Sequence, residues 1–354
     1  MKNKHKYIVL FLTCIIFLIS SCATTLKVNV TRPAKLNLNG AKTIAVLPFT
    51  PSDKNPFNYF FSGDKDILSN YFNYYSQISS VEHDVIDNIK QSLESSLMKS
   101  PYITLVNSRD VKSALKYGGK NPADVLIGGE IVSFRVNDRE LKEKRKVPDS
   151  DADGKKPEYY YEFSYTRDVE LIINYEIVDG DTRRIIAHDT KRYNESSGNY
   201  KKVKDLPNIY YMLSDDLNSF VSELMRDIQP YTVSKSITLL EDKTDDPNMK
   251  NADELAQSGY YKESYSQFIK IYMHKKQFEA GYNAAMLLLA MGELESSEAL
   301  MSEVYRNHGD KRALDALYDI RNEIKQAKIL DNQINPISDE ADYEVFTFDY
   351  DDFD

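Results

Sequence analysis

Between residues 41 and 240, apolar side chains recur at spacings typical of strands and of amphipathic helices. Residues 43–49 (TIAVLPF) are almost wholly apolar, as expected of a buried strand. In residues 81–99, apolar positions recur every three or four residues, which indicates an amphipathic helix. These patterns predict an α/β domain over residues 41–240. Further strands are predicted over 102–106, 124–134, 165–178 and 183–193, with helices over about 107–115 and 214–228.

Two stretches of this domain fit no buried element. Residues 138–158 are rich in charges of both signs and are predicted to be a charged insertion. Residues 50–80 form a long connection that is rich in aromatic side chains. Such a group of rings either covers a sheet edge or helix, or forms a docking patch for a partner. The residues that we assign to this patch are Phe57, Tyr59, Phe60 and Phe61.

Residues 249–328 are helical in pattern, and the pattern repeats with an offset of 33 residues. The polar stretch 241–248 marks a domain boundary before them. Helix, glycine turn and helix follow one another, which resembles tetratricopeptide repeats. A generic bundle of helical hairpins is the alternative. The resemblance implies a concave face that binds a protein partner, with Tyr261, Tyr265 and Tyr282 as expected contacts. Matching positions include Ala252 and Ala285, Gly259 and Gly292, and Ser264 and Ser297.

The N-terminus joins a basic segment, a short apolar run and a cysteine. The twelve residues 8–19 reach only about 18 Å as a helix, too short for a bilayer core of roughly 30 Å, so they suit a signal peptide. Residues 19–22 (ISSC) resemble the bacterial lipobox. The resemblance implies a signal peptide over 1–21, acylation of Cys22, for example with palmitate, and a tether over 22–40. It also favours the outer membrane, facing the periplasm. An ordinary secretory signal is the alternative.

Several segments of the first domain resemble the curli-secretion (CsgG-like) lipoprotein family, which includes peptidoglycan-synthase activators. They are residues 44–49 (IAVLPF), 108–110 (SRD), 123–131 (ADVLIGGEI), 177–179 (IVD) and 184–187 (RIIA). The resemblance implies a mixed sheet flanked by helices in a non-enzymatic envelope protein. Some members form a secretion pore from membrane-spanning hairpins. The charged residues 138–158 cannot supply an uncharged lipid-facing strand, so we expect an adaptor.

Charge excludes nucleic acid as a ligand. The chain has 45 Lys and Arg against 55 Asp and Glu, a formal net charge of −10, whereas phosphate binding needs clustered cations.

Residues 331–354 contain no Lys or Arg, and eight acids after residue 338 are interleaved with five aromatic residues. This composition predicts an acidic, disordered tail over 329–354. The tail either keeps the protein soluble or docks onto another surface.

The sequence contains few motifs that are typical of catalytic, cofactor or metal sites. The sequence holds no G-x-S-x-G, phosphate-binding loop or dinucleotide-binding motif, and no two histidines have ligand spacing. We therefore predict no enzyme activity and no cofactor. Asp149, Asp151 and Asp153 match the first half of a calcium loop, but Tyr160 stands where a bidentate glutamate is needed. We expect a solvated loop there and no metal.

The sequence as a whole predicts an α+β fold followed by an all-α repeat domain. We expect a membrane-anchored scaffold or adaptor in envelope assembly or secretion, which acts through protein–protein contacts. Two alternatives stay open. One is a subunit of an oligomeric export channel, which would make the chain a homo-oligomer. The other is a hydrolase whose site forms only in the folded chain.

Overall fold

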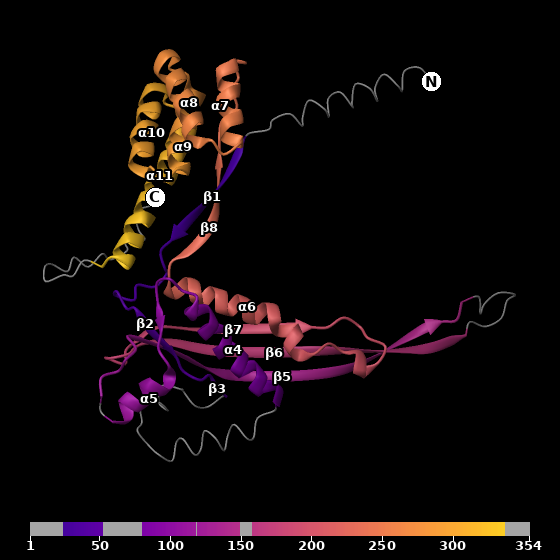
Figure 1. Ribbon diagram of the computed structural model, residues 1–354. Helices are drawn as coiled ribbons and strands as arrows, with labels where there is room; N and C mark the ends of the chain where they lie inside the picture. Colours follow the sequence, from indigo (N-terminus) through magenta and orange to yellow (C-terminus); the bar gives the residue numbers. More distant parts are fainter. Residues whose placement is uncertain (1–23, 52–79, 118, 149–157, 337–354) are drawn as a thin grey trace. The chain divides into compact units, whose positions relative to one another are not determined.

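The computed structural model describes residues 24–51, 80–117, 119–148 and 158–336 (Figure 1). The chain divides into two compact units. The sheet unit is Ala34–Gln229. The helical unit joins Pro230–Asp354 to the N-terminal segment that ends at Pro33. The sequence predicts the boundary near residue 240, about ten residues after the observed boundary at Gln229. The prediction is late because the strand that begins the second unit is polar on one side.

The sheet unit contains a mixed sheet in the order β4-β2-β5-β6-β7, with β3 beside β5. Strand β2 runs parallel to both β4 and β5, whereas β5, β6 and β7 are antiparallel. The predicted α+β class and mixed sheet are therefore confirmed. The strands are β2 (Thr43–Val46), β3 (Thr50–Pro51), β4 (Thr104–Leu105), β5 (Val125–Lys146), β6 (Tyr159–Asp179) and β7 (Ile185–Ser196).

Helices cover both faces of this sheet because its central strands are apolar on both sides. Helices α4 (Ser80–Met98) and α6 (Ile209–Ile228) pack with one set of strand residues into the larger core. The ring of Phe220 contacts Phe49 and Tyr175 edge to face, with centroids 6.2 and 5.5 Å away. Helix α5 (Ser108–Lys116) contributes to the smaller core on the opposite face.

The described residues of the helical unit form a two-stranded ribbon and five helices. Strands β1 (Thr25–Arg32) and β8 (Tyr231–Thr238) pair antiparallel over their full length. Successive helices pack against one another, and α7, α9 and α11 also contact the ribbon. The helices are α7 (Pro247–Gln257), α8 (Tyr261–Lys275), α9 (Phe278–Ala290), α10 (Leu294–His308) and α11 (Lys311–Ile334).

The 33-residue offset appears as repeated geometry in this unit. Gly259 and Gly292 end the first helix of each hairpin with φ of 82° and 81°. Glycine suits these turns because a side chain is disfavoured at positive φ. The buried hydroxyl of Ser264 donates to the carbonyl oxygen of Ala252, and Ser297 has the same relation to Ala285.

The first strand of the helical unit begins almost at the lipobox. Thr24 is buried, and its hydroxyl donates to Asp253 Oδ2 at 2.7 Å. The prediction of a tether over 22–40 is therefore wrong from Thr25 to Arg32. The alternation of Leu26, Val28 and Val30 with polar residues is a strand signal.

Two further predictions need correction. Residues 138–146 are not part of a charged insertion, because β5 continues to Lys146, and residues 149–157 lie outside the described residues. The predicted tail over 329–354 begins too early, because α11 extends to Ile334. Within the described residues, no helix is both long and apolar enough to cross a membrane.

Candidate functional site

The most distinctive surface of the sheet unit is the outer part of the β5–β6 hairpin, which we call the arm. It comprises Asp138–Lys146 of β5 and Tyr159–Arg167 of β6. Among the described strands, no third strand pairs with this stretch, although Tyr165 forms an isolated bridge with Tyr200. Figure 1 shows the two strands running well past the rest of the sheet.

Two arginine–aspartate pairs fix the base of the arm. Arg167 donates two hydrogen bonds of 2.7 Å to the carboxylate of Asp138, which lies directly opposite on β5. These bonds hold the pKa of Asp138 below its usual value. Arg139 donates to Asp168 at 2.5 Å, and this bond together with one from Ser196 lowers the pKa of Asp168. The bidentate Arg167–Asp138 pair also fixes the relative geometry of its two side chains.

One face of the arm combines lysines with aromatic rings, and we call it the aromatic face. Residues directly opposite in an antiparallel pair share a face, and the face alternates along each strand. The register places Phe163 opposite Lys142, Tyr161 opposite Lys144, and Tyr159 opposite Lys146. Tyr159, Tyr161 and Phe163 on this face are 52%, 54% and 44% exposed, whereas Tyr160 pairs with Arg145 on the opposite face.

The ammonium groups lie over neighbouring rings. Lys142 Nζ is 4.1 Å from the ring centroid of Tyr161 and 5.5 Å from that of Phe163. Lys144 Nζ is 4.3 Å from the centroid of Tyr159. Each contact contributes roughly 0.5–1 kcal/mol at an exposed site. Within the described part of the chain, neither Lys142 nor Lys144 belongs to an ion pair.

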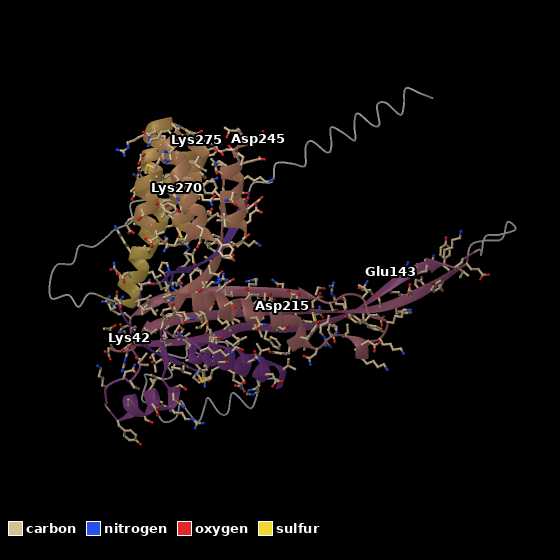
Figure 2. All side chains as sticks on the ribbon, turned by 45° about the horizontal axis from the view of Figure 1, so that its top comes forward. Lys42, Glu143, Asp215, Asp245, Lys270 and Lys275 are labelled. Carbon is tan, nitrogen blue, oxygen red and sulfur yellow. The ribbon has the colours of Figure 1, made fainter. Side chains whose placement is uncertain are left out.

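The opposite face of the arm carries charges that neutralise one another. Arg145 contacts Glu143 at 2.8 Å and Glu162 at 3.0 Å. Figure 2 shows Glu143 well out along the arm. Lys142 and Lys144 on the aromatic face are thus the cations of the arm that lie over rings and form no ion pair among the described residues. Rings and ammonium groups together suit a partner surface that offers both carboxylates and apolar area.

Most residues that the sequence singles out lie outside the described residues. This applies to the acylation site Cys22, to the aromatic patch of Phe57, Tyr59, Phe60 and Phe61, and to the calcium candidates Asp149, Asp151 and Asp153. They stay predictions. Among the described residues, no group of three or more His, Cys, Asp or Glu side chains could hold a metal ion.

The three tyrosines predicted in the repeats contribute mainly to the helical core. Tyr261 and Tyr265 on α8 and Tyr282 on α9 are all half-buried against it. The ring of Tyr282 lies 6.0 Å from that of Phe278, and burial raises the pKa of Tyr282. Among the ring pairs of the described residues, none joins Tyr282 to Tyr261 or Tyr265.

The chain itself covers the helices that the resemblance assigns to a partner. Asn283 on α9 accepts from the backbone N–H of Leu240 at 2.7 Å and donates to its carbonyl oxygen at 2.8 Å. Ile237 and Leu239 are buried beside the same helices. The ribbon and its continuation therefore pack against α7, α9 and α11.

Sequence reasoning missed the aromatic face, although a signal was present. Lysines stand at every second position in 142–146, and three tyrosines follow at 159–161. A period of two indicates a strand even where both sides are polar. The high charge obscured this pattern.

Comparisons with known proteins give only distant likenesses. No family model matches the chain, and no curated protein matches its sequence. Similar solved structures include the PelC dodecamer from Paraburkholderia phytofirmans, with 11% identity, a TM-score of 0.27 and coverage of 58% of this chain and 99% of that one. The hypothetical protein CT253 from Chlamydia trachomatis has 10% identity, a TM-score of 0.28 and coverage of 52% and 95%. Lipoprotein GNA1162 from Neisseria meningitidis has 10% identity, a TM-score of 0.21 and coverage of 53% and 97%. All three TM-scores lie below 0.5, so these likenesses carry no argument about this chain.

Proposed function

We propose that the chain is a non-enzymatic scaffold or adaptor of the cell envelope, anchored through Cys22 and acting through protein–protein contacts. The observation that carries this proposal is the aromatic face of the arm. The arm, held at its base by two Arg–Asp pairs, presents Tyr159, Tyr161 and Phe163 on one face, and each of these rings is 44–54% exposed. Exposed aromatic side chains that gather on one face often mark a contact with a partner. The lipobox resemblance supports the anchor, and the outer membrane is its proposed location.

The exposed rings also have a structural explanation. Lysines and charged pairs on a sheet edge prevent strands from pairing with other chains, and lysine stems cover rings without any partner. This explanation accounts for the lysines. It does not account for three aromatic side chains on one face that are each 44% exposed or more.

The test replaces Tyr159 and Tyr161 by serine in the full-length lipoprotein. Crosslinked complexes are then purified from membranes, identified by mass spectrometry and sized by native electrophoresis. We expect a discrete envelope partner that the arm variant loses. Tyr211→Ser is the matched control, because Tyr211 on α6 of the same unit is 74% exposed.

Two results would overturn the scaffold proposal. If the arm variant retains every partner while its circular dichroism is unchanged, the aromatic face is not the contact. If the wild-type complex contains only copies of this chain, the subunit of an oligomeric export channel becomes the better hypothesis.

A further inference from the structure

The helical unit contains a groove between the ribbon and the helices. Its volume is about 270 Å³. Apolar side chains of β1, α9, α10 and α11 form most of its wall, including Val28, Val30, Leu289, Leu294 and Leu330. Pockets that are largely apolar with a few converging polar groups are typical ligand sites.

The groove exists because the helices fully cover the inner face of the ribbon at only one of its two ends. On its inner face, Leu26 is 4% exposed and Ile237 is 1% exposed. Val28, Val30 and Val233 on the same face are only half-buried. The layer between ribbon and helices is thus left unfilled toward Arg32.

A cluster of three charges lies in the groove wall. Glu323 on α11 is 5% exposed and accepts from Arg32 at 2.5 and 2.8 Å and from Lys235 at 2.6 Å. Glu323 is the only acid among the groove residues, so two cations face one carboxylate. The ribbon strands hold Lys27, Arg32 and Lys235 and no acid. The groove therefore suits a ligand that joins a carboxylate to an apolar side chain.

We propose that the acidic segment 339–354 of the same chain folds back and occupies this groove. Charge favours this occupant, because the segment has eight acids and no Lys or Arg. Composition favours it as well, since aromatic residues occur throughout the segment and most of the groove wall is apolar. The five are Tyr343, Phe346, Phe348, Tyr350 and Phe353.

Chain length and position also favour the tail. Ala327 and Leu330 on α11 line the groove, and the described residues end six positions after Leu330. The last turn of α11, from Leu330 to Ile334, spans only about 6 Å. The sixteen residues 339–354 extend to roughly 50 Å, so the segment can turn back and reach the cations. A folded-back tail would make the groove unavailable to other acidic segments.

The first test measures binding directly. The chain is ended at Pro336, and a fluorescein-labelled peptide of residues 339–354 is added while anisotropy is recorded. We expect micromolar binding that weakens with salt. Leu330→Lys should weaken it about tenfold or more by placing a charged side chain in the apolar wall. Leu314→Lys is the matched control, because Leu314 lies on the same helix and is 45% exposed.

The second test uses the full chain. Hydrogen exchange of residues 324–334 should be slower in the full chain than in the chain ended at Pro336, at every protein concentration. Equal exchange, equal binding by the Leu330→Lys variant, or equal binding of a scrambled peptide would overturn the proposal. Protection that grows with concentration would instead assign the groove to the tail of a second copy and would also overturn it.

Discussion

The hydroxyl of Ser264 lies 2.6 Å from the carbonyl oxygen of Ala252 and donates to it across the α7–α8 hairpin. Ser297 and Ala285 repeat this bond at 2.8 Å in the next hairpin. Both serines are fully buried. Because a small residue lets two helices approach closely, the bond and the close contact support each other.

The repeated bond predicts equal losses of stability. Ser264→Ala and Ser297→Ala should each lower the free energy of unfolding by about 1 kcal/mol, the net value of a buried hydrogen bond. Urea denaturation followed by circular dichroism measures this loss. Ser296→Ala is the control, because Ser296 is exposed on the same helix as Ser297. A loss at only one of the two buried serines would contradict the structural equivalence.

Gly129 in β5 should not tolerate a side chain. A Cβ there would lie 2.4 Å from the carbonyl oxygen of Asn174 and 2.4 Å from Cε1 of Phe49. Since backbone cannot move aside as a flexible side chain can, Gly129→Ala should destabilise the sheet unit by at least about 3 kcal/mol. Thermal unfolding tests this. Gly198→Ala is the control, because nothing lies within 4 Å of its added Cβ.

Glu323 should make the stability of the helical unit depend on acid pH. Burial alone would raise its pKa, but hydrogen bonds from Arg32 and Lys235 outweigh burial, so the pKa lies below its usual value of 4.5. Its stabilising contribution is therefore complete above pH 4.5. It is lost as the pH falls through the lower folded-state pKa.

The substitution Glu323→Gln tests this stabilising contribution. It should cost about 2 kcal/mol at neutral pH, because two cations lose their carboxylate but keep some contact with water. Glu298→Gln breaks a more exposed pair with Arg321 and should cost less than about 0.5 kcal/mol. Denaturation at pH 7 and pH 3 measures both variants. Equal effects of the two substitutions would show that the buried cluster does not stabilise the unit.

Asp216 on α6 should make the stability of the sheet unit fall, rather than rise, as the pH increases. Its Oδ2 is buried with no hydrogen-bond partner among the described residues. Burial and the nearby Glu195 raise its pKa. A raised folded-state pKa means that stability is greatest below the unfolded-state value, about 3.9, and falls as the pH rises through the folded-state pKa.

Asp216→Asn should therefore stabilise the sheet unit by about 1 kcal/mol at pH 7 and have little effect at pH 3. Denaturation midpoints at the two pH values check this. Asp215→Asn is the control, because Asp215 is exposed on the same helix (Figure 2). Destabilisation by Asp216→Asn at pH 7 would show that the carboxylate is stabilising.

The elements that the sequence predicts well have a buried side. Periodic apolar residues gave α4 and α6 to within a few residues, and Asn107 caps α5 as expected, accepting from the backbone N–H of Arg109. The sequence predicts such elements because the spacing of apolar residues alone indicates which side faces the core.

The elements that were missed depend on distant partners or lack a core. Strand β1 pairs with β8, about 200 residues later in the chain, and its alternating pattern resembles a polar tether until that partner is known. The arm has no buried side, so its strands show no apolar alternation. The groove could not be predicted because it arises only when segments distant in the chain come together. The aromatic face left a signal in the alternating lysines of 142–146, which the high charge obscured.

If Cys22 is acylated as proposed, the position of Thr25 at the start of β1 would limit how far the helical unit can move from the lipid. With Cys22 acylated, only Ala23 and Thr24 separate the lipid from the ribbon. The three peptide units from Cys22 to Thr25 span about 10 Å at most. The predicted tether of 18 residues would instead reach roughly 60 Å. The helical unit would thus stay at the headgroup layer, and any competitor for the groove would have to approach the membrane surface.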